Sequence, residues 1–172
     1  MFIPKLGAAA STAHASPQTK LIGNFKSSTL GLGTLSARRD AADLIVSVRF
    51  QQPVESALGA ISTAPKLAAD LVLTLSAPGT TNPNIEPGHS VSTRVRATGS
   101  SVDVRFNAAE LASAATGTSG IGSLELAVHT IVGDPLRPLS MEFHGGKVDF
   151  AEPNSHTSSR TGTYYVDAEL FR

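Results

Sequence analysis

Few residues of this sequence have the types and spacing that catalysis or metal binding requires. Glu142 and His144 lie two residues apart in an alternating run, so a β-strand would place both on one face, where they could share a metal ion. A metal site needs three or four ligands, however, and no tight cluster of acids and histidines supplies the rest. We therefore expect a solvated polar face here, with no metal and no other cofactor. His129 alternates with Glu125 and Ala127, and we interpret this less apolar face as a surface or a subunit contact.

Two glycine-containing segments match nucleotide-binding or catalytic motifs only in part. The segment Gly31–Gly33 begins like a dinucleotide-binding loop, but Ser36 stands where the third glycine is needed and a strand pattern follows instead of a helix. The segment Gly117–Gly120 resembles a nucleophile elbow, but Ile121 replaces the last glycine and no strand leads into it. We interpret this second segment as a flexible turn. Since no catalytic motif is present, we predict that the protein is not an enzyme.

The most concentrated basic side chains lie between Ser92 and Arg105. We expect a β-hairpin in which Arg94, Arg96 and Arg105 project from one face, with Asp103 beside them. Three guanidinium groups could bind phosphates or carboxylates bidentately. However, Asp103 would compensate part of their charge, and no aromatic residues are interleaved for base stacking. We therefore favour ion pairs within the chain or between subunits over nucleic-acid contacts.

The N-terminal part of the chain is basic although the formal net charge of the whole sequence is zero. Residues 1–39 carry +5 and residues 40–172 carry −5, an asymmetry that favours an anionic partner. The basic residues of this segment are Lys5, Lys20, Lys26, Arg38 and Arg39. Within it, residues 1–29 are rich in Ala, Ser and Thr, and we predict an N-terminal arm that contacts nucleic acid or neighbouring subunits. A polar extension that keeps the chain soluble is the simpler alternative, and no secretory signal is evident.

From residue 30 onward the hydrophobic pattern is that of short β-strands. Asp43–Phe50 alternates apolar and polar residues, which is typical of a half-buried strand, and similar runs predict eight or nine strands. One of these runs would place Leu139, Met141 and Phe143 on its core face, and the last strand would cover Tyr164–Leu170. The predicted inward-facing residues include Val46, Val48, Phe50, Val104, Phe106, Leu126 and Val128.

Two connections have the pattern of short helices. These are Pro53–Ile61 and Asn107–Ser113, and in the second Asn107 and Glu110 have the spacing of a capping box. Together the elements predict an all-β fold over residues 30–172: an antiparallel, eight-stranded, jelly-roll-like β-sandwich with one or two short helices in its connections. The length of 172 residues fits one such domain.

Composition excludes several further classes of protein. The sequence has no cysteine, so disulfides and thiolate metal sites are excluded. No apolar run approaches the ~18 residues that span a bilayer, and we expect no membrane partner. Only 16% of the residues are charged, which fits flat, closely packed contacts better than a site with converging titratable groups.

A weakly basic arm, eight β runs and two short connecting helices resemble the layout of small icosahedral viral coat proteins of the jelly-roll type. The resemblance covers the whole chain and rests on no sequence motif. It implies a self-assembling coat subunit located in the virion, whose copies tile a closed shell around the genome with basic arms facing it. This chain departs from the family in its thin basic arm and in lacking an obvious acidic cluster for calcium.

A β-sandwich binding module, such as a carbohydrate-binding or adhesion domain, is the alternative function. Such modules usually present Trp or Tyr platforms to sugar rings. This chain has no Trp, and its two tyrosines are the adjacent Tyr164 and Tyr165.

Overall fold

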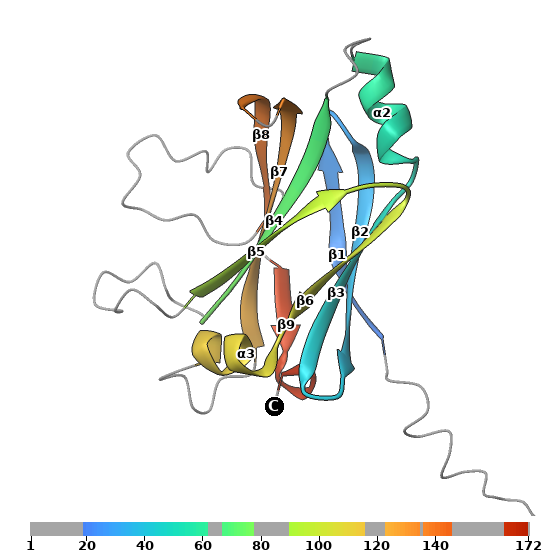
Figure 1. Cartoon of the computed structure of the whole chain (residues 1–172). Coiled ribbons are helices and arrows are strands. Elements are labelled where there is room, and N and C mark those ends of the chain that lie inside the picture. The colour runs from blue at the N-terminus through green and yellow to red at the C-terminus, as the bar shows by residue number, and fades with distance from the viewer. Residues whose placement is uncertain are drawn as a thin grey trace, which may run out of the picture.

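Two antiparallel β-sheets packed face to face make up the fold (Figure 1). The computed structural model describes residues 19–61, 67–77, 90–115, 123–134, 136–145 and 164–171. The first sheet consists of β1 (Lys20–Ser27), β2 (Gly31–Asp40), β3 (Asp43–Phe50) and β6 (Ser101–Phe106). The second consists of β4 (Ala68–Ser76), β5 (Ser90–Ala97), β7 (Ser123–Asp134), β8 (Arg137–Gly145) and β9 (Tyr164–Asp167). The predicted all-β sandwich is confirmed, with nine strands in the described parts of the chain.

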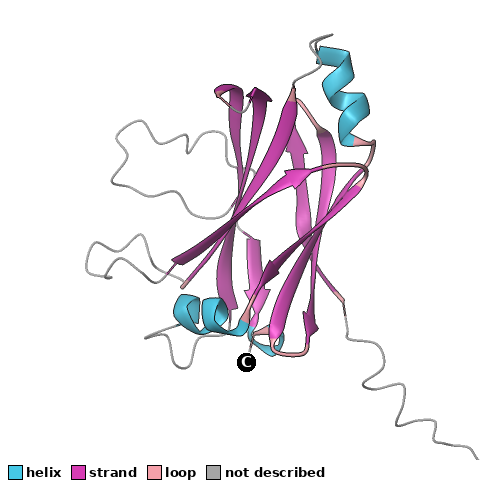
Figure 2. Ribbon diagram, viewed as in Figure 1, coloured by secondary structure: helices cyan, strands magenta, loops and turns pink. Residues whose placement is uncertain are grey.

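The chain crosses between the sheets three times. The first sheet has the order β1-β2-β3-β6 and the second β5-β4-β7-β8, with β9 also paired to β7. The crossings run from β3 to β4 through α2 (Val54–Ile61), directly from β5 to β6, and from β6 to β7 through α3 (Ala108–Ala115). Figure 2 shows the two helices at opposite ends of the sandwich, which they close. Both helices lie where the sequence predicts them.

The inner faces of the two sheets form one hydrophobic core. All seven residues predicted to face inward are at most 3% exposed, which confirms the strand phases assigned to β3, β6 and β7. In the first sheet Val46 lies opposite Val104, and in the second Leu73 lies opposite Val128, so each sheet contributes paired apolar side chains to the interior. Alternation with polar outward residues follows from the pleat of the strands.

The capping box predicted for α3 is present. The backbone N–H of Glu110 donates to Asn107 Oδ1 at 2.9 Å, and the backbone N–H of Asn107 donates to Glu110 Oε1 at 2.8 Å. Two helix N-terminal donors are satisfied in this way, so the helix begins at Ala108.

The structure corrects the boundary of the predicted arm. Residues 1–18 lie outside the described residues, but β1 lies within the segment assigned to the arm and pairs with β2. Phe25 is 2% exposed and lies opposite Gly33, where a Cβ atom would be 2.2 Å from Phe25 Cζ. The ring of Phe25 packed over Gly33 thus anchors β1, although apolar and polar residues alternate only weakly in its sequence. The sandwich begins at Lys20, and deletion of residues 1–29 would remove a strand and part of the core.

The last predicted strand is also shorter than expected. β9 ends at Asp167, and a 3₁₀ helix, η2 (Ala168–Leu170), follows it. Leu170 and Phe171 are buried at 5% and 9% exposure, so this turn brings two apolar side chains back to the core.

Candidate functional site

The predicted basic hairpin between Ser92 and Arg105 does not exist as one unit. β5 and β6 belong to different sheets, because the chain crosses the sandwich at Gly99, which has a positive φ of 63°. The backbone of Gly99 is fixed by α2: its carbonyl accepts a hydrogen bond from Val54 N–H, and its N–H donates to Glu55. This fixed corner sends Arg94 and Arg105 to opposite outer faces.

Arg94 and Arg96 on β5 both bind Asp70 on β4. Arg94 Nε lies 2.8 Å from Asp70 Oδ2, and Arg96 Nε lies 2.5 Å from Asp70 Oδ1. Burial alone would raise the pKa of Asp70, but the hydrogen bonds and charges of the two arginines outweigh it and lower the pKa. The favoured prediction of ion pairing within the chain is confirmed for both arginines.

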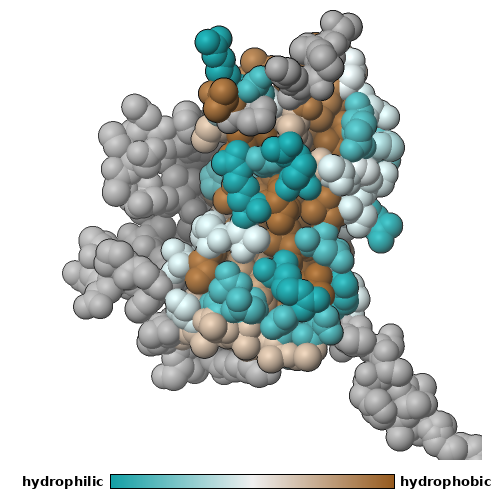
Figure 3. All heavy atoms as spheres, in the orientation of Figure 1, coloured by the Kyte–Doolittle hydropathy of each residue, from teal (hydrophilic) through white to brown (hydrophobic). Residues whose placement is uncertain are grey.

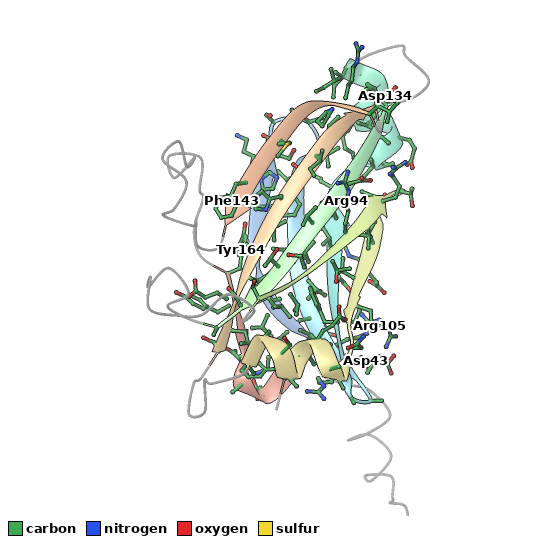
Figure 4. The ribbon with its side chains drawn as sticks, turned by 60° about the vertical axis from the view of Figure 1, so that its left-hand side comes forward. Asp43, Arg94, Arg105, Asp134, Phe143 and Tyr164 are labelled. Carbon is green, nitrogen blue, oxygen red and sulfur yellow. The ribbon has the colours of Figure 1, made fainter. Side chains whose placement is uncertain are left out.

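Arg105 and Arg38 form a second set of ion pairs on the outer face of the first sheet. Arg105 lies 2.8 Å from Asp40 and 2.6 Å from Asp43, and these hydrogen bonds raise the pKa of its guanidinium group. Figure 4 shows Arg105 beside Asp43 at one end of the sandwich, away from Arg94. Asp103, expected beside Arg105, instead pairs with Arg38 at 3.4 Å. These carboxylates occupy the guanidinium groups that were candidates for phosphate binding.

The remaining basic candidates have different surroundings. Lys20 forms an ion pair with Glu169, and Arg39 donates to the carbonyls of Leu170 at 3.1 Å and Ala41 at 3.5 Å. Lys26 is exposed on the outer face of β1, and Lys5 lies outside the described residues. Of the eight candidates, Lys20, Arg38, Arg39, Arg94, Arg96 and Arg105 therefore hold acceptors within the chain.

Glu142 and His144 lie in a polar cluster at the seam between β1 and β8. Ser27 Oγ donates to Glu142 Oε1 at 2.7 Å, while the backbone N–H and hydroxyl of Ser28 reach Glu142 Oε2 at 3.0 and 2.6 Å. Thr130 Oγ1 lies 2.8 Å from His144 Nε2 and 3.5 Å from Glu142 Oε1. The predicted solvated face is wrong for His144, which is 2% exposed, and Glu142 beside it is half-buried.

Burial and hydrogen bonding set the charge states of this cluster. Burial would raise the pKa of Glu142, but the hydrogen bonds from Ser28 and Ser27 outweigh it and lower the pKa. Burial lowers the pKa of His144, more than the charge of Glu142 raises it. An ionised Glu142 and a neutral His144 thus hold the edge of one sheet against the edge of the other.

Aromatic side chains complete this contact between β1 and the second sheet. The Tyr164 hydroxyl donates to the carbonyl of Asn24 at 2.8 Å, and the rings of Phe25 and His144 lie 4.9 Å apart. Tyr164 is 5% exposed, so only Tyr165, at 47% exposure, could offer a ring to a sugar. In the described parts of the chain, no group of three or more His, Asp and Glu residues could hold a metal ion.

The face around His129 is more buried than the sequence suggests. Glu125 is 2% exposed within the single chain, which contradicts a surface position for this residue. His129 packs against Phe143 with ring centroids 4.8 Å apart, and burial lowers its pKa.

The outer face of β8 and the turn that precedes it expose three large apolar side chains. Leu136, Leu139 and Met141 are 89%, 64% and 66% exposed. The prediction that Leu139, Met141 and Phe143 face the core is wrong, because the pairing of Thr130 with Glu142 turns the polar residues of β8 inward. We call Leu136, Leu139 and Met141 the β8 strip; Figure 3 shows hydrophobic atoms at the free end of the β7–β8 hairpin. The side-chain types alone did not indicate it, since the same residues fit a core face.

Comparison with models of protein families, with curated proteins and with solved structures finds no match. Among the described residues, no helix is both long enough and apolar enough to cross a bilayer. The segment Gly117–Gly120 lies outside the described residues.

Proposed function

We propose that the protein is a structural subunit that self-assembles into a closed shell, as a viral or phage coat subunit does around its genome. The observation that carries the proposal is the β8 strip. Its three side chains are 64–89% exposed, and groups of exposed apolar side chains often mark contact sites. A second copy of the chain is the partner we assign to it.

The character of the strip supports a contact between identical copies. From Leu139 to Phe143 the outward residues of β8 carry no charge, so two copies can meet there without like-charge repulsion. A standard interface buries ~1,600 Å² in total, so the contact we propose extends beyond these three side chains onto the neighbouring residues of the second sheet. An edge strand with exposed apolar residues is also a feature that monomers normally avoid.

The other polar features of the described chain favour a structural role over catalysis. Asp40, Asp43, Asp70 and Asp103 on the outer faces each pair with an arginine, and the half-buried Glu142 and the buried His144 hydrogen-bond to neighbouring strands. Networks of this kind fix the position of the strands.

Light scattering coupled to size-exclusion chromatography, with negative-stain microscopy, tests the proposal. The intact chain should elute as a large closed assembly, and the double variant Leu139→Ser/Met141→Ser should elute as a folded monomer. Ile61→Ser, which removes an exposed apolar side chain at the end of α2, is the matched control and should assemble. A monodisperse monomer of 17.8 kDa at all protein and salt concentrations would refute self-assembly.

A further inference from the structure

A hollow on the outer face of the first sheet differs in charge from the rest of that face. It has a volume of about 440 Å³, within the ~300–1,000 Å³ typical of small-molecule sites, and its lining includes Asn24, Leu32, Thr34, Arg49 and Gln51. The residues come from three neighbouring strands, since Asn24 on β1 lies opposite Thr34 on β2, which lies opposite Arg49 on β3.

Arg49 is the chemical centre of this hollow. Among the described residues, Arg38, Arg94, Arg96 and Arg105 each pair with a carboxylate, whereas Arg49 is exposed and has no carboxylate within ion-pair distance. Its planar guanidinium group therefore keeps its full capacity for a bidentate acceptor. The sequence pattern placed Arg49 on the outer face but offered no reason to separate it from the other arginines.

The neighbours of Arg49 are also hydrogen-bond donors. Thr34 Oγ1 donates to Asn24 Oδ1 at 3.2 Å, which turns the amide nitrogen of Asn24 away from that bond and leaves it able to donate to a ligand. Gln51 supplies a second amide to the lining of the hollow, and the exposed Lys26 lies opposite Leu32 on the adjacent strand.

Two of the three acids of this face, Asp40 and Asp43, lie at its other end, and Arg105 engages both. Asp103 lies between that end and Arg49, and Arg38 engages it, so each of these acids is paired with an arginine. The end that contains Arg49 and Lys26 carries two unpaired positive charges among the residues that the structure describes. This segregation of charge favours an anionic ligand over a neutral one.

We infer that this hollow, centred on Arg49, binds phosphate groups of a single-stranded nucleic acid. The inference rests on the proposed function only for the choice of a nucleic-acid strand as the source of the phosphate. Phe25 and Phe50 line the hollow but are 2% and 3% exposed, so no ring is available to stack on a base. Contacts through phosphate alone fix the strand without reading its sequence, and binding is therefore independent of base composition.

Fluorescence anisotropy with labelled 12-nucleotide oligo-U and oligo-A tests the inference on the intact protein over a series of salt concentrations. Arg49→Gln should weaken binding of both oligonucleotides several-fold at low salt and reduce the slope of log K against log salt by about 0.7, the value for one lost phosphate contact. The matched control is Arg94→Gln, which removes the same charge from the other sheet while Arg96 still holds Asp70. This control should leave the affinity and the slope unchanged.

Three results would overturn the inference. Equal losses in the two variants would show that only net charge matters, and unchanged binding by Arg49→Gln would show that the hollow is not used. Displacement of the oligonucleotide by a dicarboxylate more readily than by a mononucleotide would assign the hollow to carboxylates. Light scattering on the same samples separates this inference from the proposed function: a protein that assembles but does not bind the oligonucleotides contradicts the hollow and leaves self-assembly intact.

Discussion

Glu142→Gln tests whether the polar cluster holds β1 against β8. The substitution keeps the size of the side chain but replaces one carboxylate oxygen with an amide nitrogen that cannot accept a hydrogen bond. Ser28 donates to Oε2 through both its backbone N–H, at 3.0 Å, and its hydroxyl, at 2.6 Å. One orientation of the glutamine amide would therefore place its NH₂ group against these two donors. The reverse orientation would place the NH₂ group against Ser27 Oγ, which donates to Oε1 at 2.7 Å in the parent.

The expected loss of stability follows from these contacts. A hydrogen bond to a charged group contributes about 1.5–3 kcal/mol when it is buried, and Ser28 is exposed, so its two bonds contribute less than twice that value. We expect the free energy of unfolding at pH 7 to fall by about 2 kcal/mol. Urea unfolding measures this loss, and Asp167→Asn, at an exposed carboxylate without a side-chain cap bond, is the matched control.

The same variant has a defined pH dependence. The pKa of Glu142 is lowered in the folded protein, so its carboxylate contributes stability above the ordinary value of 4.5 and loses it as the pH falls through the folded value. The difference between the parent and Glu142→Gln should therefore shrink below pH 4.5. A difference under about 0.5 kcal/mol at pH 7, the size of an ordinary surface effect, would refute the reasoning. A full difference that persists in acid would refute it as well.

Further substitutions test the buried His144, the core, a glycine and a helix cap. Burial lowers the pKa of His144, so the unfolded chain takes up a proton first as the pH falls below the ordinary value of 6.5; His144→Gln should flatten the fall in melting temperature between pH 7.5 and 5. Phe106→Ala should cost ~3–5 kcal/mol in urea unfolding because its ring is fully buried, and an unchanged midpoint would contradict its position in the core. Gly33→Ala should cost roughly 1–3 kcal/mol, since its Cβ would lie 2.2 Å from Phe25 Cζ, whereas Gly59→Ala in α2 meets nothing within 4 Å and should be neutral or stabilising. Asn107→Ala should cost about 1 kcal/mol of thermal stability by removing the capping box of α3.

Local periodicity predicted the strands whose inward faces are mainly apolar. In β3, β6 and β7 the inward-facing positions are mainly apolar and buried, so the inward-facing residues could be identified from the period of two. The helix caps could also be predicted, because a capping box depends on residues only three positions apart.

Strands β1 and β8 could not be predicted in the same way. β8 reverses the expected pattern because its inward residues Glu142 and His144 are satisfied by Ser27 and Thr130, from other strands. β1 depends on the fit of Phe25 over Gly33, which no pattern within either strand reveals. The ion pairs of the arginines likewise depend on the sheet to which each strand belongs. Arg94 and Arg105 lie on different sheets because the chain crosses the sandwich at Gly99.

The two surfaces assigned here lie on opposite sides of the sandwich. The β8 strip belongs to the outer face of the second sheet, and the hollow around Arg49 belongs to the outer face of the first. Since the core separates these faces, a copy bound at the strip does not occupy the hollow, and both contacts can form at once. The seam held by Glu142 connects them, because β1 contributes Asn24 and Lys26 to the region of the hollow while β8 carries the strip. Loss of that seam should therefore weaken both contacts together, whereas substitutions in the strip or at Arg49 should affect only one.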